Sequence, residues 1–266
     1  MSGTIEFSLE NGIDRIRFNR PELKNALSQS MCAQLAQHVR EIQDDPAVRV
    51  IVIEGVGKDF CTGADVGSMA ELTNGTPQQR AALVDTAIRE VSHGIFVPLG
   101  QLPQPIIVSA RGWAVGAGFQ FAAMADLVVA SETARFSIPL VNLAHTTDHG
   151  ESYYLPRKVG MARAAQMMLL AEPLNAADAD RYGFVNWVVA DDQLEAKTSD
   201  IANRLASGAY TAVVGMKALL RDSLHNPLLD QFDQERRMAK KCVATEDFVE
   251  AIHAFNERRR PVFNGR

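Results

Sequence analysis

Apolar and polar positions alternate along the first twenty residues of the chain. Ile5–Leu9 and Ile13–Phe18 each carry an apolar residue at about every second position, and Asn11-Gly12 stands between them. A period of two is that of a half-buried strand, and Asn-Gly is a preferred pair for a tight turn. The pattern predicts an antiparallel hairpin.

A helical period follows. Met31, Leu35, Val39 and Ile42 recur every three or four residues behind Ser28. This spacing predicts a helix with Ser28 as its N-cap. The next run, VRVIVIE at 48–54, is almost continuously apolar and β-branched, as expected of a strand that is buried on both faces.

Strands and helices alternate through the rest of the first two thirds of the chain. Thr76-Pro77 predicts the start of a long helix whose apolar positions continue to Ile95, followed by a strand at 106–110, a short helix at 119–124 and a strand at 127–130. This order favours an α/β fold with mostly parallel pairing. Beyond Gln193 the pattern is helical, so we expect a core over 1–195 and a helical region over 196–266.

Two glycine-rich stretches directly follow predicted strands. The first, at 55–67, includes Gly63, and the second, at 112–118, includes Gly116 and Gly118. Ligands of parallel α/β sheets bind beyond the carboxyl ends of the strands, so both stretches could face one site. Small residues at the start of a helix leave backbone N–H groups free to stabilise a developing anion. The alternative is a tight strand-to-helix turn in a packed core.

Composition and charge exclude several classes of function. The chain has 266 residues, a net charge of −5, 47% apolar and 22% charged residues, which is ordinary for a globular protein and lacks the basic surface of a nucleic-acid binder. No apolar run approaches the ~18 residues of a membrane span, and no secretory signal opens the chain. Three scattered cysteines fit a reducing compartment, so we expect a cytoplasmic protein with neither nucleic acid nor membrane as partner.

A series of motifs in fixed order resembles the enoyl-CoA hydratase/isomerase family, also called the crotonase family. The matching segments are NRPELKNALS at 19–28, FCTGAD at 60–65, RGWAVGAGFQFAAMADLVVA at 111–130, FSIP at 136–139, LPRKVG at 155–160, LLAEPLNAADADRYGFVNWVV at 169–189 and AFNERRRPVFNGR at 254–266. The resemblance implies a spiral of strand–strand–helix repeats and a C-terminal helical region that builds homotrimers, often paired as hexamers. It also implies an acyl-CoA thioester substrate, with coenzyme A entering as part of the substrate and no separate cofactor.

The resemblance also assigns an oxyanion hole. Family members hold the thioester oxygen with two backbone amides, which correspond here to Ala64, behind Gly63, and Ala117, behind Gly116. Donors aimed at this oxygen stabilise the enolate more than the thioester, because the enolate oxygen carries more charge. Many relatives have glycine where Ala117 stands; alanine keeps the N–H, and the donor survives if its φ is negative.

The chain departs from the family at both hydratase glutamates. The two positions hold Gln120 and Leu140. Gln120 can hold a water or a polar substrate group but takes no proton near neutral pH, and Leu140 does neither. Hydration by two glutamates is therefore not expected, and Leu140 is expected to line the acyl pocket.

The loop that follows concentrates titratable groups. Asp148 stands where several isomerases of the family place their catalytic carboxylate, and an apolar environment would raise its pKa into a useful range. Alternatively, Asp148 caps a helix in a capping box with Glu151. His145, His149, Glu151 and Gln120 are candidate assistants, although each histidine could equally support the loop. Metal binding by this loop is not expected, because no complementary ligand motif stands elsewhere.

Residues for coenzyme A follow from the resemblance. Lys24 corresponds to a position near the phosphates, Asp65 and Val66 to a segment near the adenine, and Phe263 would pack against the adenine. The basic run at 258–260 would add charge to an otherwise acidic protein. The alternatives are a solvated basic tail and a structural role for Asp65.

Three hypotheses remain. The first is an isomerase that shifts a carbon–carbon double bond through an enolate, with Asp148 carrying the proton. The second is another enolate reaction on the same scaffold, such as atypical hydration, decarboxylation or thioester hydrolysis. The third is a non-catalytic acyl-CoA-binding homologue.

Overall fold

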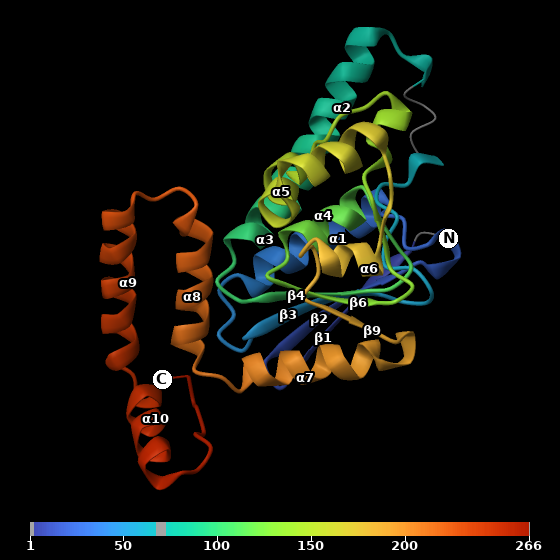
Figure 1. Cartoon of the computed structure of the whole chain (residues 1–266). Helices are drawn as coiled ribbons and strands as arrows, with labels where there is room; N and C mark the ends of the chain where they lie inside the picture. Colours follow the sequence, from blue (N-terminus) through green and yellow to red (C-terminus); the bar gives the residue numbers. More distant parts are fainter. Residues whose placement is uncertain (1–2, 68–72, 266) are drawn as a thin grey trace.

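The computed structural model describes residues 3–67 and 73–265, and its main element is a six-stranded sheet (Figure 1). The strand order is β1-β2-β3-β4-β6-β9. The predicted hairpin is confirmed, because β1 and β2 pair antiparallel, and every later neighbour pairs parallel. The strands span Thr4–Glu10, Ile13–Asn19, Val50–Gly55, Ile106–Ala110, Leu127–Ser131 and Trp187–Val189.

A second, three-stranded sheet forms beside the first, in the order β5-β7-β8. Its strands span Trp113–Val115, Arg135–Ser137 and Leu174–Asn175. Strands β4 and β5 are followed by helix α4 (Ala117–Met124), and β6 and β7 are followed by helix α5 (Glu151–Leu170). The chain therefore repeats a strand–strand–helix unit, and the predicted α/β fold is confirmed.

Helices cover both faces of the large sheet. On one face lie α1 (Gln29–Ile42), α3 (Val97–Gln101) and α4, and on the other lies α7 (Leu194–Ala206) (Figure 1). Each side has its own apolar cluster. Helix α7 packs against β2, β3, β4 and β6. It therefore belongs to the core by its contacts, although most of it lies beyond the expected boundary at residue 195. The remaining helix of the core, α6, spans Ala176–Arg181.

Helix α1 forms for the reasons visible in its sequence. The hydroxyl of Ser28 accepts a hydrogen bond from the Met31 amide at 3.2 Å and so caps the first turn. The four apolar residues at helical spacing, Met31, Leu35, Val39 and Ile42, are all buried. Capping and burial act together here, so the element and its orientation follow from the pattern.

Helix α2 (Pro77–Val91) has the predicted start but not the predicted packing. Thr76 and Gln79 form a capping box at its N-terminus, as the sequence suggests. None of its residues is buried, however, and Figure 1 shows the helix projecting beyond the body of the molecule. The apolar stripe reaches the core only where the helix changes into a π-helical turn, Ser92–Phe96, in which Ile95 and Phe96 are buried.

The C-terminal helices leave much apolar surface uncovered. Helices α8 (Tyr210–Ser223) and α9 (Leu228–Val243) lie side by side, and α10 (Glu246–Glu257) follows (Figure 1). One link to the core is Lys217 of α8, whose Nζ lies 2.7 Å from a carboxylate oxygen of Asp126. No residue of α9 is buried. No helix in the described part of the chain combines the length and apolar character that crossing a bilayer requires.

Helix α4 packs closely against the first loop at Gly118. A Cβ at Gly118 would lie 2.1 Å from the backbone oxygen of Cys61, whereas a Cβ at Gly94 would meet Ala36 at an ordinary 3.5 Å. We expect Gly118→Ala to lower the free energy of unfolding by at least about 2 kcal/mol, because a backbone atom must move. Gly94→Ala, the matched control, should be neutral or stabilising by up to about 1 kcal/mol. Urea denaturation of both variants would measure this, and equal stabilities would contradict the packing described.

Candidate active site

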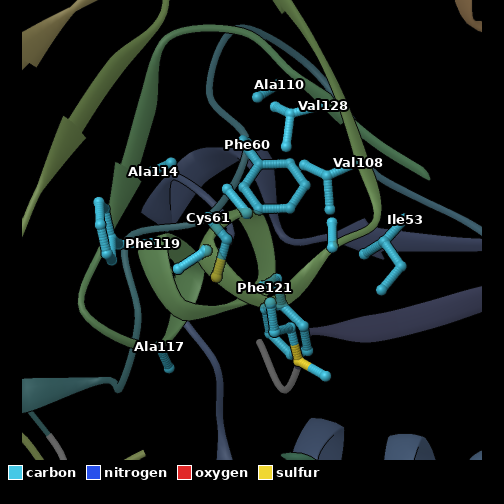
Figure 2. Close-up of a cluster of buried hydrophobic side chains, with 14 of the residues drawn as sticks. Ile53, Phe60, Cys61, Val108, Ala110, Ala114, Ala117, Phe119, Phe121 and Val128 are labelled. Atoms are coloured by element: carbon cyan, nitrogen blue, oxygen red, sulfur yellow. The ribbon is translucent and has the colours of Figure 1, made fainter. Parts of the chain in front are cut away.

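The two glycine-rich loops are joined by backbone hydrogen bonds. The amide of Cys61 donates to the Trp113 oxygen at 3.0 Å, and the amide of Val115 donates to the Cys61 oxygen at 2.9 Å. Figure 2 shows the side chain of Phe60 beside Val108, so apolar contacts anchor the first loop as well. The two loops therefore lie side by side, as the prediction that both face one site requires.

This pairing brings the two proposed oxyanion amides together. A Cβ at Gly63 would lie 2.7 Å from the Val115 oxygen and 3.1 Å from the Ala117 nitrogen, so the chain just before Ala64 runs directly against the start of α4. Only glycine fits there, since its φ is also positive at 79°. Neither alanine has a positive φ, so the methyl of Ala117 is accommodated and its N–H is kept.

Helix α4 begins without a side-chain cap. Its N-cap is Gly116 (φ 54°, ψ −117°), and the amide of Gln120 makes the first bond within the helix, to the Gly116 oxygen at 2.9 Å. A Cβ at Gly116 would meet nothing within 4 Å, so there is open space beside the helix start. Uncommitted N–H groups at the positive end of a helix dipole, next to open space, can stabilise an anion.

The side chain of Asn25 holds the first loop through hydrogen bonds to its backbone. It is fully buried, has a left-handed backbone (φ 57°), and its Nδ2 donates to three carbonyl oxygens, of Val56 (3.0 Å), Asp59 (2.8 Å) and Phe60 (3.1 Å). Its Oδ1 accepts from the amide of Arg20 at 2.8 Å. Four backbone groups therefore depend on one side chain.

Asp65, expected near the adenine, is held by an ion pair. An Oδ of Asp65 lies 2.7 Å from a guanidinium nitrogen of the buried Arg20, which also donates to the Ala26 oxygen. The backbone on either side of Ala64 pairs with Leu27, at 2.7 Å and 3.1 Å. In this structure Asp65 fixes the loop that carries the Ala64 amide.

The other residues expected to bind coenzyme A are divided between two places. Lys24 is exposed and its carbonyl accepts from the Thr62 amide at 3.1 Å, so it lies beside the first loop, as does the exposed Val66. Phe263 belongs to a segment that folds back along α10, where Asp247 accepts from the Asn264 amide at 2.8 Å.

The segment that carries Phe263 lies at the other end of β3 from the first loop. A Cβ at Gly265 would lie 3.3 Å from Arg49, which precedes β3, whereas the first loop follows the carboxyl end of β3. Figure 1 likewise shows α10 on the other side of the sheet from α4. Within a single chain, Phe263 is therefore not brought to the site of Lys24 and Val66.

Gln120 and Leu140 stand close to the titratable loop. Gln120 is fully buried on α4, and neither atom of its amide has a hydrogen-bond partner among the described residues. A Cβ at Gly150 would lie 3.3 Å from its Nε2, so the amide abuts the loop that carries Asp148. Leu140 lies half-buried in a 3-10 helix, Pro139–Leu143, and packs on the core.

Asp148 is a half-buried carboxylate in an apolar environment. Its side chain is 18% exposed, and burial raises the pKa of its carboxyl, partly opposed by His145. One of its oxygens, Oδ1, lies 3.7 Å from Nε2 of His149, whose ring stacks on Phe96 with centroids 5.0 Å apart. Because its pKa is raised, the Asp148 carboxylate is a stronger base than the carboxylate of an exposed aspartate.

The capping interpretation of Asp148 is wrong. The N-cap of α5 is Gly150, with φ 104° and no side-chain cap, and Glu151 turns back to accept from the His149 amide at 3.0 Å. Glu151 is fully buried with one carboxyl oxygen unpaired among the described residues. Burial raises the pKa of Glu151 and lowers the pKa of His149.

His145 lies at the edge of this group. Its Nδ1 is 2.6 Å from the Thr146 oxygen, and the ring influences Asp148 only electrostatically in the contacts described. Among residues 3–67 and 73–265, no three histidine, cysteine, aspartate or glutamate side chains are grouped to hold a metal ion.

Sequence reasoning missed Ser92 at this site and offered Phe96 only as a candidate lining residue of the acyl pocket. Ser92 and Phe96 come from the π-helical turn after α2; the Ser92 hydroxyl donates to the Asp148 carbonyl at 3.1 Å, and Phe96 stacks on His149. In the sequence they read as the end of an amphipathic helix. Only the change of helical pitch points both side chains at the titratable loop.

A separate pocket lies on another part of the molecule. It has a volume of about 430 Å³ and lies between the sheet edge and α7, with Arg17, Glu54, Arg111 and Glu195 in its lining. Arg17 and Glu54 form a 2.6 Å ion pair within it, and Arg111 pairs with Asp191 outside the lining. It shares no residue with the two loops at 60–66 and 113–120.

Comparisons with known proteins agree with this geometry. The family model for enoyl-CoA hydratase/isomerase matches residues 8–266. A probable enoyl-CoA hydratase of Rhodobacter capsulatus is 33% identical over 264 residues, covering 99% of this chain and 98% of the relative. A trans-2-decenoyl-[acyl-carrier-protein] isomerase of Streptococcus mutans is 29% identical and covers 98% of each. A crystal structure of the enoyl-CoA hydratase/isomerase type from Mycobacterium abscessus has a TM-score of 0.93 at 32% identity, covering 98% of this chain and all of that one.

The raised pKa of Asp148 predicts a pH-dependent cost to stability. The pKa of the Asp148 carboxyl is higher in the folded protein than in the unfolded chain, where it is near 4. The folded protein is therefore less stable when this carboxyl is ionised than when it is protonated. The contribution of Asp148 to the free energy of unfolding is largest below the pKa of the unfolded chain, and it is lost as the pH rises through the pKa of the folded protein. Asp148→Asn should therefore gain stability over the wild type between pH 4 and pH 7, with the difference vanishing at the acid end.

Thermal unfolding at a series of pH values would measure this. Asp85→Asn, at an exposed position on α2, is the matched control and should show no such gain. A loss of stability in Asp148→Asn at pH 7 would contradict the burial described for the carboxylate.

Proposed function

The chain belongs to the enoyl-CoA hydratase/isomerase family, and we propose that it is an isomerase that moves a carbon–carbon double bond in an acyl-CoA thioester. The observation that carries this proposal is the set of acid–base groups at the site. Neither hydratase glutamate is present, because the positions hold Gln120 and Leu140. Two desolvated carboxyls remain, Asp148 and Glu151, and of these only Asp148 is partly exposed and so accessible to a substrate. Several relatives are named hydratases, but that reaction needs a water to be positioned and deprotonated by groups that this chain lacks.

The proposed reaction begins with an enolate. The amides of Ala64 and Ala117 bind the thioester oxygen while Asp148 removes a proton from the carbon next to the carbonyl. The C–H electron pair forms a double bond to the carbonyl carbon, and the π electron pair of the carbonyl moves onto the oxygen. The two N–H groups and the α4 dipole stabilise the negative charge on that oxygen.

The same carboxyl group then completes the double-bond shift. In a 3-enoyl thioester the enolate is conjugated with the double bond, so the electron pair returns to form the 2,3 double bond and the terminal carbon of the system takes the proton from Asp148. No water is consumed, and Asp148 ends ionised as it began. A carboxyl of raised pKa suits this role, since it must both accept and release the proton.

The carrier in the proposal is coenzyme A. Lys24 is exposed beside the first loop and supplies a positive charge for phosphates in a protein of net charge −5. One isomerase relative is named for an acyl-carrier-protein thioester, which shares the same reacting group. No separate cofactor enters the proposed reaction. The three cysteines are unpaired, in keeping with a reducing, cytoplasmic environment.

We further propose that the protein assembles as a homotrimer, or as a pair of trimers, through its C-terminal helices. Large apolar side chains are exposed there at a density unusual for a monomer. They are Met216, Leu220, Leu224, Leu228, Leu229, Phe232, Phe248, Val249, Ile252 and Phe255. A second copy would also allow the segment with Phe263 to reach a neighbour's coenzyme A site, which it does not reach within one chain.

Isomerisation should depend on the Asp148 carboxylate. With a mixture of 2-enoyl- and 3-enoyl-CoA thioesters in deuterated water, we expect mass spectrometry to show a shifted double bond, incorporated deuterium and no added water. Asp148→Asn should lower the rate at least about a hundredfold, because the amide is not a base, while coenzyme A thioesters still raise its melting temperature. Asp85→Asn should retain wild-type rates.

Other outcomes of that screen discriminate the alternatives. Added water, released free coenzyme A or released carbon dioxide would replace the isomerase by a different enolate reaction. Binding without any change in a thioester would favour a non-catalytic acyl-CoA-binding protein.

Assembly should depend on the exposed face of α9. Light scattering after gel filtration should give three or six times the chain mass of 29.1 kDa. Leu229→Glu combined with Phe232→Glu should release monomers, because charges replace two apolar side chains of the interface. Leu83→Glu, on the exposed surface of α2, is the matched control and should leave the assembly intact. A wild-type protein that elutes as a monomer would refute the proposed assembly.

A further inference from the structure

The hydroxyl of Ser92 lies between two polar atoms of the Asp148 loop. It donates to the carbonyl oxygen of Asp148 at 3.1 Å, and its Oγ lies 3.1 Å from Nδ1 of His149. Ser92 opens the π-helical turn, whose Phe96 also stacks on the His149 ring. Two contacts from one turn therefore fix the position of a single imidazole.

The hydrogen-bond count assigns the tautomer of that ring. A serine hydroxyl has one proton, and here it is given to the Asp148 carbonyl, so Oγ faces Nδ1 with its lone pairs. Nδ1 must then carry the hydrogen. Burial lowers the pKa of His149, so the ring is neutral near neutral pH and its Nε2 has a free lone pair. That nitrogen faces Oδ1 of Asp148 at 3.7 Å.

We propose that His149 is a positioning residue for Asp148, held by Ser92 in the tautomer whose Nε2 is an acceptor, and that this makes Asp148 a stronger base. Its consequence for turnover rests on the proposed isomerase function, whereas the tautomer itself does not.

The chemical reason lies in which form of Asp148 each tautomer favours. When Asp148 takes a proton from the substrate carbon, the C–H bond breaks and the new carboxylic O–H can donate to Nε2. The opposite tautomer would present an N–H to the ionised carboxylate, stabilise it, and weaken the base. The proton stays on Asp148 and returns to the substrate, so the imidazole gains and loses nothing over a turnover.

Other groups around the ring do not supply this effect. Glu151 and a hydrogen bond to the Asp148 backbone favour the protonated ring and His145 opposes it, and burial still lowers the pKa of the ring. The π-helical turn contributes a hydroxyl and an apolar ring, and Gln120 of α4 is an uncharged amide. In the part of the chain that the structure describes, the titratable groups that face His149 are Asp148, Glu151 and His145.

Nuclear magnetic resonance of the histidine ring nitrogens tests the tautomer without any substrate. In protein labelled with ¹⁵N at its six histidines, the resonance lost in His149→Phe identifies the ring. We expect wild-type His149 to carry its hydrogen on Nδ1 at pH 7. Ser92→Ala should shift the ring toward the Nε2–H tautomer, and Ser92→Thr, which restores the hydroxyl, should return it.

The matched control removes a similar hydroxyl from the same helical run. Thr86→Ala loses a bond from Oγ1 to the Ala82 oxygen on the exposed surface of α2 and should leave the His149 resonances unchanged. A wild-type ring with its hydrogen on Nε2, or a ring that does not respond to Ser92→Ala, would overturn the proposal.

The second arm measures turnover against pH. In Ser92→Ala we expect deuterium exchange into the thioester to have a kcat lower by on the order of tenfold and an unchanged KM, with the acid limb of the profile moved to lower pH. Ser92→Thr should restore the profile. An unchanged profile in Ser92→Ala would overturn the role in catalysis. If the wild type exchanges no deuterium, the proposed isomerase function fails, and the resonance experiment alone decides the tautomer.

Discussion

The structure depends on a short parallel pairing between two loops at 60–64 and 113–117. Each loop follows a buried strand, and β3 and β4 are neighbours in the large sheet, so the loops leave the same edge. The bonds between Cys61 and its partners at 113 and 115 then bring Gly63 against the amide of Ala117. Such close approach excludes side chains at Gly63 and Gly118. The two amides of the proposed oxyanion site are thereby positioned by the backbone rather than by side chains.

Burial shapes the chemistry of the second half of the site. Asp148, His149 and Glu151 are adjacent in sequence and all shielded from water, so each is displaced toward its neutral form. A glutamate in place of Gln120 would add a third buried carboxyl against Gly150, and like charges at short range cannot all ionise. A neutral amide at 120 adds no charge beside the carboxyls at 148 and 151, whereas a glutamate there would raise the pKa of at least one carboxyl of the group further.

Sequence patterns predicted the elements that depend on local signals and burial together. The hairpin, α1 with its Ser28 cap, and the strands β3, β4 and β6 all follow from periodicity, and the two loops follow from glycines behind strands. The helix pattern behind Thr76 was misleading in one respect, because no residue of α2 is buried and its apolar stripe packs on the core only at its end, at Val91, Ile95 and Phe96. Periodicity reports which face is apolar, but it does not report what covers that face.

The parts that sequence could not predict are those where two distant segments share one contact. The role of Ser92 requires a π-helical turn in place of a regular one, and that change depends on packing of Ile95 and Phe96 rather than on their identity. The capping box expected at Asp148 fails for a similar reason: Glu151 is drawn back to the His149 amide inside the core, and Gly150 turns the chain at φ 104°. The capping rule describes helix ends that are exposed to solvent, whereas the first residue of α5, Glu151, is buried. The residues that break local rules are accordingly those that surround Asp148.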